Sequence, residues 1–156
     1  MSQRGMTLVE LLVGIAIAGL IASVLGSSIH TFIISSDRGN DRLSALHDIQ
    51  NAAYWISSDS QMAETTDLVN GAPPVDYMAL SWTDKFGGGE VSHSSIYSLS
   101  GTELQRDYDG VVRTVARHIS ALEFSIDSDL LTVTLGSSLG GITEERTYDI
   151  CLRPAS

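Results

Sequence analysis

The sequence predicts an α+β fold in which one long N-terminal helix packs on an antiparallel β-sheet. Three observations predict this fold. Residues 11–29 are a run of 19 residues without an ionisable side chain. Apolar residues then recur every three or four positions as far as Ile56, and short segments of alternating polarity follow from Asp67. A helical period followed by a strand period indicates a helix that precedes a sheet.

Composition and charge limit the classes of function. The chain has 156 residues, of which 43% are hydrophobic and 18% charged, and its formal net charge is −10. Nucleic-acid binding needs a basic patch, and the nine Lys and Arg residues form no cluster. We therefore expect one acidic domain with an apolar appendage and no nucleic-acid partner.

The apolar run is long enough to cross a membrane once. As a helix, 19 residues span ~28 Å, close to the ~30 Å hydrocarbon thickness of a bilayer. We predict a transmembrane helix over residues 6–35. A cleaved secretory signal and a plain signal anchor are alternatives, but both leave Glu10 unexplained, because a carboxylate at the centre of a membrane helix costs ~2.5–3.5 kcal/mol. An ionisable residue in such a segment indicates a function.

The stretch "RGMTLVELLV", residues 4–13, resembles the processing site of type IV prepilins and of the related type II secretion pseudopilins. The resemblance implies that residues 1–5 are a leader, that a prepilin peptidase cuts between Gly5 and Met6, and that Met6 is then N-methylated. It also implies that Glu10 serves assembly by neutralising the N-terminal amine of a neighbouring subunit. Ser27 stands where many major pilins have proline, which favours a minor subunit.

Small residues recur within the apolar helix. They stand four apart and therefore share one face, where they allow close packing of helices. The alternative, that small residues are simply frequent in membrane helices, stays open. The residues of this stripe are Gly14, Ala18, Ala22 and Gly26.

Residues 36–66 are predicted to continue the helix in amphipathic form. Gly39 and Asn40 could separate two helices or bend a single one, and we favour one bent helix because glycine costs only ~1 kcal/mol inside a helix. The apolar face needs a cover, which the later strands supply. Its residues are Leu43, Leu46, Ile49, Ala53 and Ile56.

Residues 67–156 are predicted to form the antiparallel sheet. The loop "LVNGAPPVDY" closes the helical part, and turns are expected at Ser100-Gly101 and Asp109-Gly110. The strand segments "ISALEFSID", "LLTVTLG" and "RTYDICLRP" alternate in polarity, as expected for a sheet with one buried face. This order resembles minor pseudopilins and minor pilins of the J-like and W-like type.

Signals of catalysis are few. The four histidines have no metal-binding spacing, no GxSxG motif occurs, and Gly87 to Gly89 read as a loop. We expect no enzyme, no cofactor and no metal site. Calcium would need six to eight oxygens, so two acidic pairs are weak candidates that would require a further acid such as Asp84 or Glu90. The pairs are Asp107 with Asp109 and Asp127 with Asp129.

Cys151 is the only cysteine, which excludes a disulfide within the chain and a cysteine-based zinc site. Strand alternation puts it on the face of Asp149 and Arg153, out of phase with Ile150 and Leu152. We expect a packed, unreactive thiol rather than an intermolecular disulfide.

Together, the residues and the resemblance predict a structural subunit that initiates or caps a type IV pilus or a type II secretion pseudopilus. Its expected partners are other minor and major pilin-like subunits, the prepilin peptidase and the cytoplasmic membrane. We expect a single-pass protein whose C-terminal domain lies outside the cytoplasm. The alternative is a signal-anchored extracytoplasmic domain that binds or hydrolyses a ligand.

Overall fold

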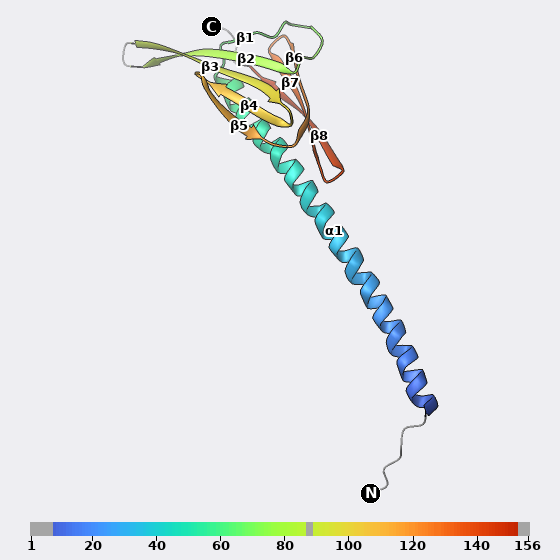
Figure 1. Cartoon of the computed structure of the whole chain (residues 1–156). Helices are drawn as coiled ribbons and strands as arrows, with labels where there is room; N and C mark the ends of the chain where they lie inside the picture. The colour runs from blue at the N-terminus through green and yellow to red at the C-terminus, as the bar shows by residue number, and fades with distance from the viewer. Residues whose placement is uncertain (1–7, 87–88, 153–156) are drawn as a thin grey trace. The chain divides into compact units, whose positions relative to one another are not determined.

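The computed structural model describes residues 8–86 and 89–152. It begins with a helix of 55 residues, α1 (Leu8–Met62), and continues with eight strands (Figure 1). The chain divides into two compact units, Met1–Asn40 and Asp41–Ser156. The second unit, which we call the head domain, contains the last two fifths of α1 and all the strands.

Helix α1 is continuous through Gly39 and Asn40. The prediction of one helix rather than two is therefore confirmed. Gly39 has no atom within 4 Å of the position that a Cβ would occupy, so its presence does not reflect a close contact in the single chain.

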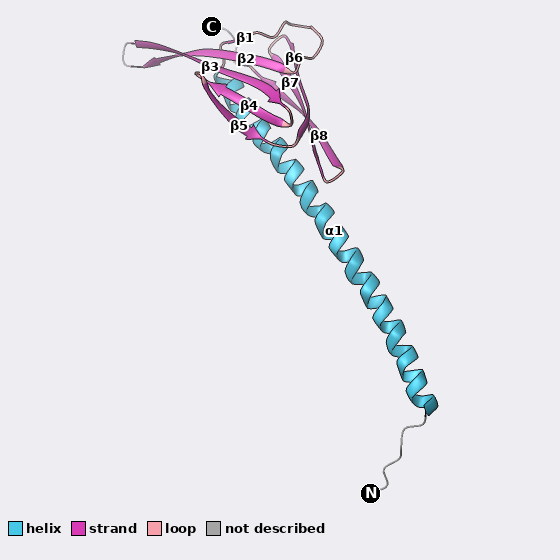
Figure 2. Ribbon diagram, in the orientation of Figure 1, coloured by secondary structure: helices cyan, strands magenta, loops and turns pink. Residues whose placement is uncertain are grey.

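The first five strands form one antiparallel sheet in sequence order (Figure 2). Both turns predicted from Gly101 and from Asp109-Gly110 are present, between β3 and β4 and between β4 and β5. Asp109 and Gly110 have φ angles of 51° and 83°, the left-handed values that a two-residue hairpin turn requires. The strands are β1 (Thr65–Thr66), β2 (Tyr77–Phe86), β3 (Gly89–Ser100), β4 (Glu103–Tyr108) and β5 (Val111–Ala116).

The last three strands form a second antiparallel sheet, in the order β6-β7-β8. The predicted packing of a long helix on antiparallel strands is confirmed, and the strands form two sheets rather than one. The chain leaves the first sheet after β5, where His118 adopts a φ of 54° and the Ile119 amide donates to the Thr102 carbonyl at 2.9 Å. The strands are β6 (Ile119–Asp127), β7 (Leu130–Leu139) and β8 (Ile142–Cys151).

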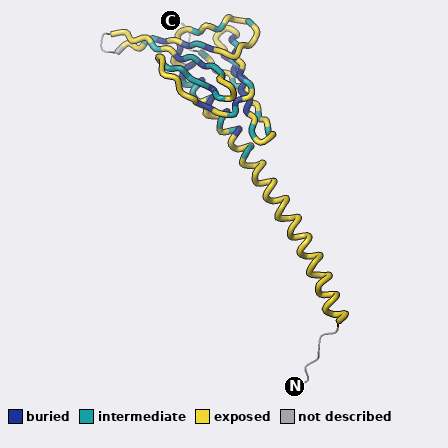
Figure 3. Tube along the Cα trace, in the orientation of Figure 1, coloured by how far each residue is buried: buried dark blue, intermediate teal, exposed yellow. Residues whose placement is uncertain are grey.

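The core of the head domain lies between the last two fifths of α1 and the two sheets (Figure 3). Alanines on the buried face of α1 let the sheets approach the helix axis closely, and they alternate with two isoleucines. The face predicted from sequence is therefore rotated: Leu43 is 67% exposed, and Leu46 and Ala53 are only half-buried. The apolar residues that α1 buries are Ala45, Ile49, Ala52 and Ile56.

Candidate functional site

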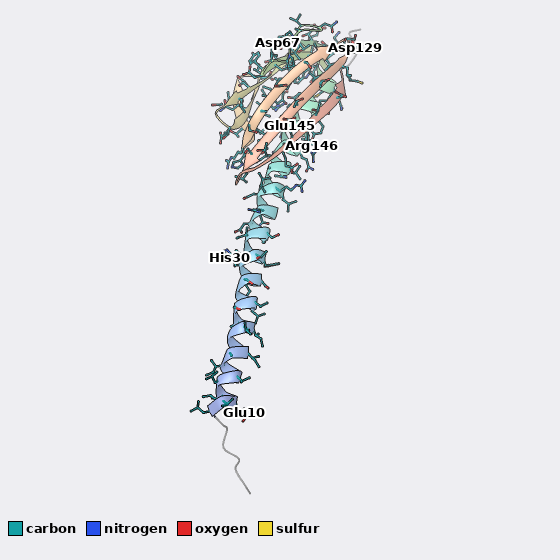
Figure 4. All side chains as sticks on the ribbon, turned by 90° about the vertical axis from the view of Figure 1, so that its right-hand side faces the viewer. Glu10, His30, Asp67, Asp129, Glu145 and Arg146 are labelled. Atoms are coloured by element: carbon teal, nitrogen blue, oxygen red, sulfur yellow. The ribbon has the colours of Figure 1, made fainter. Side chains whose placement is uncertain are left out.

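The predicted processing site lies outside the described residues, because Gly5 and Met6 precede the start of α1. Their roles as cleavage and methylation positions stay predictions. Glu10 lies in the first turn of α1, with its side chain exposed (Figure 4). A carboxylate in the first turn interacts favourably with the helix dipole, so this position suits the helix as well as the proposed assembly role.

The first part of α1 presents apolar side chains on all sides. Every residue from 8 to 40 is exposed, and the most apolar window of the helix has a mean hydropathy of 2.5 with none of its residues buried. By length and composition, α1 can cross a membrane. Apolar surface of this extent needs lipid or neighbouring helices as a cover.

Hydroxyl groups in this part of the helix bond to the helix itself. Ser23 and Ser27 donate to carbonyls three residues earlier, at 2.8 and 2.9 Å, and Ser28 and Thr31 donate to carbonyls four residues earlier. A polar group in hydrocarbon must find a partner within the protein. Ser27 therefore fits an apolar environment without interrupting the helix, as a proline at the same position would not.

The predicted packing stripe lies on the exposed surface of the first part of α1, residues 8–40. Gly14 and Gly26 have no atom within 4 Å of the position that a Cβ would occupy, and Ala18 and Ala22 are exposed. The single chain gives these small residues no packing partner of their own. Their role in contacts between subunits stays a prediction.

The head domain contains a buried carboxylate that the sequence analysis missed. Asp59, near the end of α1, is 1% exposed and receives four hydrogen bonds. Ser95 Oγ and Tyr97 Oη of β3 donate to its Oδ2 at 2.5 and 2.6 Å. Arg106 of β4 donates from Nε to Oδ2 at 2.6 Å and from Nη2 to Oδ1 at 2.7 Å. These contacts join α1 to two strands, and we call the four residues the Asp59 cluster.

The guanidinium of Arg106 contacts two aromatic rings. Its Cζ lies 4.9 Å from the ring centroid of Trp55 on α1 and 4.5 Å from that of Tyr108 on β4. Cation–π contacts of this kind add to the bidentate ion pair with Asp59. The guanidinium therefore keeps its charge in a half-buried position, because its environment supplies both a carboxylate and two aromatic faces.

The Asp59 cluster raises the pKa values of Tyr97 and Arg106. Burial, together with the Asp59 carboxylate, raises the pKa of Tyr97 above its usual range. Burial alone would lower the pKa of Arg106, but the hydrogen bonds and charge of Asp59 outweigh it and raise the pKa. Both residues therefore stay in the protonated form that donates to Asp59.

A signal for Asp59 was present in the sequence. Asp59 stands three residues after Ile56 and therefore extends the buried face of α1, where a carboxylate is unexpected. A buried carboxylate needs hydrogen-bond donors around it. The spacing alone did not indicate that the donors come from β3 and β4.

A second polar group lies beside this cluster. His93 lies on β3, stacked on Tyr108 with ring centroids 5.8 Å apart. Its Nδ1 lies 2.6 Å from Oδ2 of Asp109, and the Ser94 amide donates to Oδ1 of the same carboxylate at 2.8 Å. These two hydrogen bonds lower the pKa of Asp109. They fasten the β4–β5 turn to β3.

The acidic pairs proposed as weak calcium candidates lie at two separate turns. Asp107 lies on β4 and Asp109 in the turn after it, whereas Asp127 ends β6 and Asp129 lies in the turn before β7. In the described part of the chain, no three His, Cys, Asp or Glu side chains are placed to hold a metal ion together. The pairs therefore lack the further acid that a calcium site would require.

The prediction of a packed Cys151 is wrong. The thiol lies at the end of β8 and is exposed. The alternation itself is confirmed, because Ile150 is buried and Asp149 is exposed. Residue 151 simply lies on the solvent face of a sheet that has only one buried face.

Residues 1–26 match the family model described as the prokaryotic N-terminal methylation motif. No curated protein matches the chain.

The matched motif and the fold agree with each other. A prepilin-type methylation motif precedes a long apolar helix, and the end of that helix packs on antiparallel sheets. The N-terminus thus resembles that of type IV prepilins, and the helix-on-sheet arrangement is pilin-like. The motif implies processing by a prepilin peptidase and pilin-like subunits as partners, and the apolar helix fits a protein anchored in the inner membrane.

Proposed function

We propose that the chain is a minor pilin or pseudopilin, a non-enzymatic subunit that co-assembles with other pilin-like subunits to initiate or cap a type IV pilus or a type II secretion pseudopilus. The observation that carries this proposal is Glu10, which stands four residues after Met6 at the start of an apolar helix within the matched motif. The head domain would then lie outside the cytoplasm.

The proposed mechanism is an exchange of charges during assembly. Cleavage after Gly5 creates an amine on Met6, and a neighbouring Glu10 supplies the opposite charge. Each charge alone is costly in an apolar helix bundle, whereas the pair neutralises both. The small-residue stripe would allow the helices to approach closely enough for this pairing.

The minor role is supported by the continuous course of α1 through Ser27. Its hydroxyl donates to the Val24 carbonyl at 2.9 Å, so the helix keeps its regular hydrogen bonds where many major pilins have proline. A subunit with an uninterrupted helix suits an end position in a filament better than the repeating body.

The test compares two carboxylate variants of the full chain, expressed with its pilin-like partners. Glu10→Gln keeps the shape and removes the charge, so co-purification with partners should fall on the order of tenfold. Asp37→Asn is the matched control, since Asp37 lies on the same helix beyond the apolar run. Both variants should reach the membrane at wild-type levels.

Intact mass separates this proposal from a signal-anchored domain. The mature protein should have lost residues 1–5 and gained one methyl group, and Gly5→Leu should retain the leader. Equal co-purification of Glu10→Gln and wild type would contradict the role of Glu10, and an unprocessed N-terminus would contradict the proposal as a whole.

A further inference from the structure

A pocket of about 340 Å³ lies between the loop that follows β1 and the edge of β6. Its base is formed by β6, where Phe124 is fully buried and Ile126 is 8% exposed. Its wall is formed by the loop and the first residue of β2, with apolar side chains that reach into solvent. The apolar wall residues are Val69, Ala72, Val75 and Tyr77.

The loop is fixed along β6, so the pocket is formed before any ligand arrives. Val75 and Phe124 exchange both backbone hydrogen bonds, at 2.9 and 2.7 Å, and the Gly71 amide donates to the Ile126 carbonyl at 2.9 Å. The Ser128 amide donates to the side chain of Asn70 at 2.7 Å. Pro73 and Pro74 stiffen the arch between these attachments. A preformed site binds without the entropic cost of ordering a loop.

Three apolar residues of the pocket wall are exposed to solvent. Val69 is 70% exposed, Val75 46% and Tyr77 43%. Contiguous apolar surface on a soluble domain commonly marks a binding site. The pocket volume lies at the lower end of the range for ligand sites, ~300–1,000 Å³, and suits one apolar side chain of a peptide rather than a large cofactor.

The two segments that line the pocket carry charged side chains of a single sign. Residues 63–77 and 124–129, which form the pocket and its surroundings, contain five carboxylates and no Lys, Arg or His. Asp67 and Asp76 line the pocket itself. Figure 4 shows Asp67 and Asp129 at the same end of the head domain, away from Glu145 and Arg146. The five carboxylates are Glu64, Asp67, Asp76, Asp127 and Asp129.

We propose that this pocket is a docking site for an extended basic segment of a partner protein, which inserts one apolar side chain between the loop and β6. The apolar wall would bury the inserted side chain, and the surrounding carboxylates would pair with Lys or Arg on either side of it. Complementary charge steers such a segment to the site and excludes acidic ones. This inference goes beyond co-assembly, because it involves neither Glu10 nor the apolar helix.

The test measures the binding of short peptides to the full chain in a non-ionic detergent, by fluorescence anisotropy. The probe is fluorescein-labelled Lys-Lys-Leu-Lys-Lys, and micelles without protein set the blank. Replacing its Leu with Ser, or its four Lys with Glu, should weaken binding. In the protein, Val69→Ser and Asp76→Asn should each raise Kd about threefold, because one removes apolar contact and the other a charge.

Matched controls carry the same chemical changes elsewhere on the head domain. Val112→Ser alters an exposed valine of β5, and Glu145→Gln removes an exposed carboxylate of β8. Neither should change Kd. Equal effects of all four variants would show attraction to an acidic protein in general, and equal binding of the Leu and Ser peptides would exclude the pocket. Either result, or no binding of the probe, would overturn the proposal.

Discussion

The two parts of α1 show how one helix meets two different surroundings. From residue 8 to residue 40 every side chain is exposed and most are apolar, whereas from Asp41 to Met62 one face is buried against the sheets. The apolar side chains of the first part are not buried by any described residue of the same chain. The apolar face of the second part is buried by the strands of the head domain.

The polar groups of the two parts are satisfied in different ways. Ser23 and Ser27 bond to carbonyls of their own helix, whereas the Asp59 carboxylate receives hydrogen bonds from β3 and β4. Local bonds leave the helix free to move among neighbours. Bonds to distant strands fix the rotation of α1 against the sheets, and the variants below test this difference.

The largest effect is expected for Asp59→Ala. Arg106 would remain half-buried without its carboxylate, and Tyr97 would lose its acceptor, so the free energy of unfolding of the head domain should fall by about 3–5 kcal/mol. Denaturant unfolding followed by tryptophan fluorescence measures the loss. Gln50→Ala on the exposed face of α1 is the control and should change stability little.

A double variant sharpens the test of Asp59. Asp59→Leu combined with Arg106→Leu removes both charges, so it should recover part of the lost stability, because no buried charge is left unpaired. If the double variant is less stable than Asp59→Leu alone and than Arg106→Leu alone, the cluster contributes to stability beyond charge pairing.

The next largest effect distinguishes buried from exposed apolar residues of α1. Ile49→Ala should cost about 2–5 kcal/mol, because Ile49 is fully buried and its loss leaves a cavity. Leu43→Ala should stay within about 0.5 kcal/mol, because Leu43 is 67% exposed. Thermal unfolding of the two variants measures both values. Similar losses would mean that the rotated helix face is misassigned.

A smaller effect concerns alkaline pH. The pKa of Tyr97 is raised in the folded state, so above its ordinary value of about 10 the unfolded chain releases a proton that the folded chain keeps. The stability from this residue is complete below pH 10 and is lost as the pH rises further. Tyr97→Phe should flatten the fall of the urea midpoint between pH 10 and 11.5.

Tyr54→Phe is the control for this pH profile, because Tyr54 is 66% exposed. Its profile should follow that of the wild type. Identical slopes for wild type and Tyr97→Phe would show that ionisation of Tyr97 does not limit alkaline stability.

The smallest effect is expected for Ser27→Ala. The hydroxyl bonds only to the Val24 carbonyl of its own helix, so its removal leaves no distant group unsatisfied. Unfolding of the head domain should not change, and co-purification with pilin-like partners should stay within about twofold of wild type. A large loss of partners would show that Ser27 also contacts a neighbouring helix.

The sequence predicted those features that depend on local pattern. The single helix, the hairpin turn at Asp109-Gly110 and the alternation around Ile150 all follow from spacing and turn chemistry, and the structure confirms them. The methylation motif is local as well, and the family match supports it.

The features that the sequence missed depend on contacts between distant segments. Asp59 meets Arg106 across 47 positions of the chain, and no local period encodes that distance. The second sheet arises because the chain turns away at His118, a non-glycine residue with positive φ. The buried face of α1 includes Ala45 and Ala52, whose small size favours close approach but gives a weak hydrophobic signal.

The exposed thiol of Cys151 gives the protein a built-in attachment point for probes. It is the only cysteine in the chain, and it stands at the end of β8 with its side chain accessible. A maleimide dye or a nitroxide label would therefore react at one known position without any substitution. The distance from such a label to a second label on a co-purified partner would report the position of the head domain in the complex.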